Sequence, residues 1–170
     1  MSTLKVGYGT KTAYTTSGVS SLASSSTFVA GYETNEIDNT SNLYTDFLID
    51  GFITVGTTPT ANTSINIYCL GSLVSLATSA KDVFDGTASA ETLTNVGVGK
   101  GFLRLVASLE VSAATSNVRL DFGAISLASL FGGNAPPFHS LFVTHNTGVN
   151  LNATGGNHAI SYQGVSYANV

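Results

Sequence analysis

The sequence predicts a single all-β domain, an antiparallel β-sandwich or jelly roll. Apolar and polar residues alternate with a period of two over several runs, which is the pattern of half-buried strands. Clusters of Gly, Pro, Asn and Ser separate these runs, and the helix-favouring residues Glu, Lys, Arg and Gln are few. At 170 residues the chain fits one domain, spanning 1–170, with a core of its own.

Four segments show the alternation most clearly. Their apolar faces consist of Phe47, Ile49, Ile53 and Val55; Ile65, Ile67 and Cys69; Leu103, Leu105, Ala107, Leu109 and Val111; and Val118, Leu120 and Phe122. Mainly polar residues occupy the intervening positions, so each segment is predicted to be a strand with one face in the core and one in solvent.

Turn-forming clusters lie between and beyond these strands, at residues 56–60, 84–86, 113–117 and 132–137. Gly and Asn in them can adopt the left-handed backbone angles that tight turns require. Strands joined by such turns, without a strong helical stretch between them, favour a sandwich or a jelly roll and leave the choice between the two open.

The first 26 residues are rich in Ser, Thr and Ala and are weakly patterned. Two interpretations fit this stretch. It is either an extended arm that becomes ordered only on a neighbouring subunit, or an ordinary first strand followed by a loop.

Charge is unusually sparse. Charged residues make up 9% of the chain, against about 25% in an ordinary soluble domain. Such a surface is typical of secreted proteins, fibres, adhesins and subunits that neighbours cover. The net charge of -4 and six scattered cations argue against a nucleic-acid partner, and no apolar run is long enough to cross a bilayer, so no membrane partner is expected.

Met1 to Lys5 show no signal-peptide pattern, which predicts synthesis in the cytoplasm. A single cysteine, Cys69, excludes an intrachain disulfide. Because Cys69 shares a face with Ile65 and Ile67, we expect it to be a buried apolar residue rather than a nucleophile.

No catalytic or nucleotide-binding motif is present, so an enzyme is not expected and no cofactor is predicted. Gly97, Gly99 and Gly101 are separated by single residues, as in a phosphate-binding loop. Such a loop leads into a helix, whereas the residues from Phe102 onward are predicted to be a strand, so a bend or hairpin is the preferred interpretation. His139 and His145 share a strand face about 20 Å apart, too far to share a metal, although His158 is free to approach one of them.

Carboxylates gather at Glu33, Glu36 and Asp38, followed by Asp46 and Asp50. Paired acids can hydrolyse glycosides, and acidic loops can hold calcium. The chain has no Trp for a sugar platform and lacks the D-x-D-x-D-G spacing of a calcium loop. A solvated loop or a subunit contact is therefore favoured, with calcium as the best alternative.

Several segments, read in order, resemble a group of small proteins encoded among the virion genes of tailed bacteriophages. They are residues 5–10 (KVGYGT), 37–46 (IDNTSNLYTD), 131–133 (FGG) with Pro136, 142–148 (FVTHNTG), 156–159 (GNHA) and 162–165 (YQGV). The chain departs from the expected pattern after the proline turn, where His139 and Ser140 replace Trp-Gly. The resemblance implies a non-enzymatic β-sandwich component of the virion.

Within that group we expect a capsid decoration (cement) protein on the surface of the phage particle. It would bind the outside of the head, stabilise joints between capsomers, and contact the major capsid protein or other virion proteins. A symmetric homo-oligomer such as a trimer suits this role. The predicted contact residues are Leu4, Val6, Tyr8, Tyr14, Glu33, Glu36, Asp38 and Asn39.

Two alternatives stay open. The first is a tail, fibre or adaptor component of the same particle. The second is a carbohydrate-binding, lectin-like module, for which seven tyrosines offer stacking faces and the lack of Trp is unfavourable.

Overall fold

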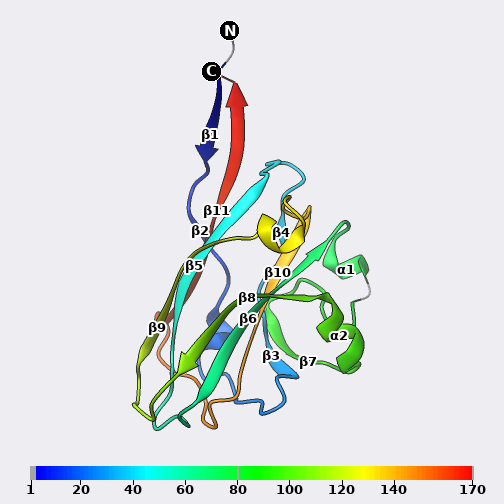
Figure 1. Cartoon of the computed structure of the whole chain (residues 1–170). Helices are drawn as coiled ribbons and strands as arrows, with labels where there is room; N and C mark the ends of the chain where they lie inside the picture. Colours follow the sequence, from blue (N-terminus) through cyan, green and yellow to red (C-terminus); the bar gives the residue numbers. More distant parts are fainter. Residues whose placement is uncertain (1–2, 80, 170) are drawn as a thin grey trace.

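A computed structural model describes residues 3–79 and 81–169 and contains two antiparallel sheets packed face to face (Figure 1). The prediction of a single-domain β-sandwich is confirmed. The first sheet has the order β1-β11-β5-β9, with β2 beside β11, and the second has the order β7-β3-β10-β6-β8, with β4 beside β10.

The strands of the first sheet are β1 (Leu4–Tyr8), β2 (Thr12–Ala13), β5 (Asp46–Thr54), β9 (Arg119–Ser126) and β11 (His158–Asn169). Those of the second sheet are β3 (Ala30–Glu33), β4 (Ile37–Asp38), β6 (Thr63–Ser72), β7 (Ser89–Thr92), β8 (Leu103–Val111) and β10 (Phe138–His145). The helical elements are η1 (Ser17–Val19), α1 (Leu76–Ser79), α2 (Val96–Phe102) and η2 (Ala128–Phe131).

The connections are those of a jelly roll, which decides between the two predicted topologies. Strand β6 pairs with β8, β5 with β9, β3 with β10, and β1 and β2 with β11. Strands of the first half of the chain therefore pair antiparallel with strands of the second half. Successive strand pairs along the chain lie alternately in the two sheets.

The predicted strands match the observed ones closely. Strand β8 spans residues 103–111, as expected, and β5 and β6 cover the predicted segments apart from Val55. Leu105, which was expected to face the core, is 48% exposed, because the register shift between β6 and β8 turns Val106 inward in its place. Strand β9 begins at Arg119 and extends four residues beyond the predicted end. Cys69 is fully buried, and burial raises the pKa of its thiol well above the usual range, which makes it an inert core residue.

The expectation of a bend or hairpin around Gly97 is wrong, because residues 96–102 form the helix α2. Asn95 caps its start, where the side-chain Oδ1 accepts a hydrogen bond from Val98 N at 3.2 Å. Gly99 packs so closely that a Cβ there would lie 2.6 Å from Leu93 Cδ2. A cap and tertiary packing thus outweigh the low helix propensity of three glycines.

Candidate functional site

Strand β1 and the last residues of β11 form a two-stranded ribbon that extends beyond the sandwich (Figure 1). Strand β11 pairs with β5 only as far as Val165, opposite Asp46. From Ser166 to Asn169, β1 is its sole neighbour in the described part of the chain. We call Leu4–Tyr8 and Val165–Asn169 the terminal ribbon.

One face of the terminal ribbon is apolar and exposed. Leu4, Val6 and Tyr8 alternate onto this face, and Tyr167 lies on it opposite Val6. Their exposed fractions are 63%, 50%, 63% and 58%, respectively, so half or more of each side chain meets solvent. Monomeric domains rarely leave such a set uncovered without a function.

The direction of this face explains its exposure. Side chains alternate along a strand, and in β11 Ile160 lies in the core while Tyr162 packs against it. Odd-numbered residues such as Tyr167 therefore point to the outside of the first sheet. The second sheet packs on the opposite side, so no folding of the sandwich on itself can cover the ribbon's apolar face.

Tyr44 anchors the base of the terminal ribbon. Its ring lies over Gly164 and Gly9, where an added Cβ would approach ring Cδ2 to 2.3 Å and the hydroxyl to 2.5 Å, respectively. Asn39 fixes the loop that carries Tyr44, since its Nδ2 donates to Tyr44 O at 2.8 Å and its Oδ1 accepts from Tyr44 N at 2.9 Å. The fold thus brings residues 38–44 to the ribbon.

The predicted contact residues divide into two groups. Leu4, Val6, Tyr8 and Asp38 are exposed, and Glu36 is half-buried. Tyr14, Glu33 and Asn39 are buried, so their expected place on a contact surface is corrected. Tyr14 packs near His139, where Oη lies 2.9 Å from Nε2, while Glu33 and Asn39 hold loops of this chain.

Glu33 is an acceptor inside the fold. It takes hydrogen bonds from Ser140 Oγ at 2.7 Å, Gly86 N at 3.1 Å and Asp85 N at 3.2 Å. Burial raises the pKa of this carboxyl to about 7, although the three hydrogen bonds lower it in part. Glu36 similarly accepts from Ser75 Oγ at 3.0 Å and from Leu76 N, so both acids tie the segment 75–86 to the sandwich.

The histidines also serve the core. His145 Nε2 lies 3.0 Å from Leu22 O, and His158 Nε2 lies 2.8 Å from Asn152 O. Burial lowers the pKa of all three imidazoles, that of His139 to about 3. Among residues 3–79 and 81–169, no three His, Cys, Asp or Glu side chains are placed to hold a metal ion.

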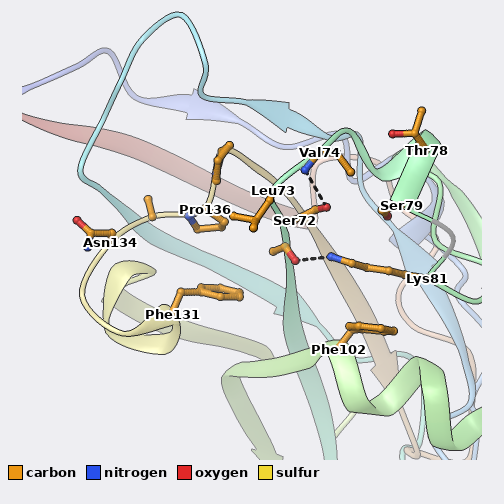
Figure 2. A pocket seen from close by; sticks show the side chains of 13 residues that line it. Ser72, Leu73, Val74, Thr78, Ser79, Lys81, Phe102, Phe131, Asn134 and Pro136 are labelled. Carbon is orange, nitrogen blue, oxygen red and sulfur yellow. Dashed lines mark hydrogen bonds between the residues drawn. The ribbon is translucent and has the colours of Figure 1, made fainter.

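A second candidate surface is a groove of about 850 Å³ beside β6. Figure 2 shows Phe131 and Pro136 on one side of it and Phe102 with Lys81 on the other. Lys81 Nζ donates to Gly71 O at 2.5 Å and lies 5.3 Å from the centroid of the Phe102 ring. The ammonium group of Lys81 thus interacts with groups of the chain itself, and burial lowers the pKa of Lys81.

Apolar side chains at the groove are also exposed. Leu73 is 83% exposed, Val74 52% and Phe102 39%. Sequence reasoning missed these residues and Leu43, and it offered Tyr167 only as one of seven tyrosines for sugar stacking, not as a contact residue. Only Tyr167 had a usable signal, the alternation of Val165 and Tyr167 with Ser166 and Ala168.

Searches against protein-family models, curated proteins and solved structures found no match for this chain. None of the described helices has the length and apolar character needed to cross a membrane. The class that fold and site define is a jelly-roll domain with a projecting apolar ribbon.

Proposed function

We propose that the protein is a structural subunit of a phage particle, a decoration protein that binds the outer surface of the head and stabilises the joints between capsomers. The terminal ribbon carries this proposal, because its apolar face points away from the protein's own core. The sequence resemblance to virion proteins supports the same role. The double-sheet jelly roll is also a common architecture of viral capsid proteins.

Docking through the terminal ribbon is energetically reasonable. Full burial of one large apolar side chain contributes about 1.5–3 kcal/mol, so the four half-exposed ones together offer on the order of 4 kcal/mol. Few charges need to be desolvated, since the ribbon's face carries none and Lys5 projects from the opposite face. Leu43, which is 73% exposed in the adjoining loop, adds to the same end of the molecule.

The proposal is tested on particles of the source phage. Antibody against the purified chain should label the whole icosahedral head in immunogold electron microscopy. In parallel, purified protein should sediment with undecorated heads, and Val6→Asp should abolish this binding. Val98→Asp is the matched control, since Val98 is 42% exposed on α2, away from the ribbon, and should bind normally.

Other labelling patterns identify other roles. Label confined to the tail would replace the decoration role with that of a tail, fibre or adaptor component. Absence of label on intact particles, with an antibody that recognises the native protein, would contradict a virion role.

A carbohydrate-binding module is the second candidate, and one observation favours it. Tyr8 and Tyr167 expose 63% and 58% of their surface on the same ribbon face, where sugar rings can stack on aromatic side chains. A glycan array separates the two proposals, because a decoration protein should give no saturable signal on it. Tyr167→Ser should remove any signal that the lectin role produces.

A further inference from the structure

We propose that two copies of the chain pair through the free edge of β1, antiparallel and centred on Val6, to form a two-fold symmetric dimer. This pairing uses the backbone edge of the terminal ribbon. It leaves the apolar face free, so it does not depend on the proposed function.

The backbone of β1 is oriented for such pairing. Gly9 N donates to Gly164 O at 2.8 Å, while Val165 O accepts from Thr45 N at 2.8 Å, on the other side of β11. In an antiparallel pair, residues alternate between bonding to the neighbouring strand and facing away from it. Lys5 and Gly7 therefore bond toward β11, and Leu4, Val6 and Tyr8 direct their N–H and C=O groups outward.

The other outer strands carry features that hinder edge pairing. Strand β7 has only four residues and includes Glu91. Strand β8 carries Arg104 and Glu110, and its register with β6 shifts after Ile67. Charges and bulges of this kind are the usual protection of an edge.

Strand β9 is protected in the same way. It carries Arg119 and Asp121 and shifts register against β5 after Ile49. By contrast, β1 carries a single charge, Lys5, is regular along Leu4–Tyr8 without proline or bulge, and projects clear of the sandwich (Figure 1). It is the edge most open to another strand.

The sequence of β1 is complementary to itself in an antiparallel register centred on Val6, the one that pairs all three outward-facing residues. With Val6 opposite Val6 of the second copy, Leu4 faces Tyr8, and all three outward-facing residues find hydrogen-bond partners. Lys5 faces Gly7, so the two lysines are not opposed. A register centred on Lys5 would place the two lysines directly opposite each other as a non-hydrogen-bonded pair, which opposes like charges, and would pair only Leu4 and Val6 among the outward-facing residues.

Pairing also gives the ribbon the strands that it lacks. A two-stranded ribbon is marginally stable in water, and three or more strands with a hydrophobic face are needed for independent stability. The dimer has the strand order β11-β1-β1-β11, and Leu4, Val6, Tyr8 and Tyr167 of both copies form one continuous apolar face. A second copy is the favoured occupant because an isologous contact uses the same edge twice and closes on itself.

Cysteine cross-linking tests the register. In this dimer the two Val6 Cα atoms lie about 5.5 Å apart, within disulfide range. The two Lys5 Cα atoms lie on a diagonal of about 7–8 Å, which a disulfide does not span without backbone movement. Native Cys69 is fully buried and does not interfere.

Under mild oxidation, Val6→Cys should therefore form a covalent dimer about tenfold faster than Lys5→Cys. Equal rates for both variants, or no dimer from Val6→Cys, would overturn the register and with it the proposal.

Light scattering after gel filtration tests the assembly. The parent chain should have twice the mass of one copy, and Val6→Pro should have the mass of one, because proline removes an outward N–H that β11 does not use. Val6→Thr keeps the N–H and should remain dimeric. A parent of one or three copies would overturn the proposal, whereas loss of head binding by a dimeric parent would contradict only the proposed function.

Discussion

Polar side chains buried between distant strands hold much of this jelly roll together. Glu33 at the end of β3 accepts a hydrogen bond from Ser140 of β10 and from the backbone of Asp85 and Gly86. The raised pKa of Glu33, about 7, has a consequence for stability. Between about pH 4.5 and pH 7 the folded chain holds a proton on Glu33 that the unfolded chain releases, so acidification stabilises the fold through this group.

Glu33→Gln should remove this contribution because the amide mimics the protonated carboxyl. The free energy of unfolding of the parent, measured relative to that of the variant, should rise as pH falls from 8 to 5. The rise should not exceed about 3 kcal/mol, since one pKa unit corresponds to about 1.4 kcal/mol. Urea denaturation of both proteins at four pH values measures it.

The comparison cancels the opposite effect of the histidines. Their lowered pKa values make acidification destabilising in parent and variant alike, below about pH 6.5. Parallel pH profiles of the two proteins would show that Glu33 has an ordinary pKa.

The burial of individual residues was predictable only where it follows alternation. Cys69 shares a face with Ile65 and Ile67, and its burial follows from that pattern. Tyr14 and Glu33 look like surface residues in the sequence because their partners, His139 and Ser140, are more than 100 positions away. Only strand pairing reveals such partners.

Strands β1 and β2 share one neighbour and are both largely exposed, but the residue that follows β2 is buried. The side chains of Leu4, Val6 and Tyr8 in β1 are exposed, whereas Tyr14, which directly follows β2, is 3% exposed and stacks near Tyr162 with ring centroids 5.0 Å apart. The sequence left two interpretations of residues 1–26 open, an arm that becomes ordered only on a neighbouring subunit and an ordinary first strand followed by a loop. Residues 4–8 are a strand paired with β11 of the same chain, which agrees with the second interpretation, an ordinary first strand followed by a loop.

Two deletions should separate these roles. Removing residues 2–9 takes away β1 and should lower the free energy of unfolding by about 1–2 kcal/mol, since it mainly removes exposed residues. Removing residues 2–16 also takes away Tyr14 and should cost about 3–5 kcal/mol more, as truncation of a buried aromatic residue does. Urea denaturation followed by circular dichroism measures both.

Tyr14→Phe in the full chain is the control, because it removes the hydroxyl near His139 and keeps the ring. Equal stability of the two deletion proteins would show that Tyr14 contributes nothing to the core.

Elements with a period of two were predictable, and those set by caps or by relative length were not. The bounds of β8 were predictable, although the register shift that exposes Leu105 was not. The helix α2 depends on the Asn95 cap and on packing of Gly99 against Leu93. The ribbon exists because β11 has 12 residues and β5 only 9. Nothing in either sequence alone indicates that difference in length.

At the scale of the whole molecule, the low number of charged residues means that contacts with a partner are expected to be mainly apolar. Two ion pairs, Lys11–Asp50 and Arg119–Asp121, occur in the described part of the chain, and both are exposed. They contribute little to stability. The terminal ribbon and the groove beside Phe102 and Phe131 present apolar surface instead.

Binding to undecorated heads should therefore depend weakly on salt. We expect the dissociation constant to change by less than about threefold between about 0.05 and about 0.5 M NaCl, a range over which screening weakens charge pairs strongly. Sedimentation of the protein with heads at each salt concentration measures it. A steep loss of binding would instead assign the contact to charged residues such as Glu36 and Asp38.

The pairing of β1 with β11 also sets an order of events during synthesis. Leu4 lies opposite Asn169, so the ribbon joins two segments from opposite ends of the described chain. Contacts between such distant positions close late, after local hairpins such as β6–β8 have formed. A nascent or truncated chain that lacks β11 thus has no terminal ribbon, so the proposed head contact and the proposed dimer edge can form only after β11 has been made.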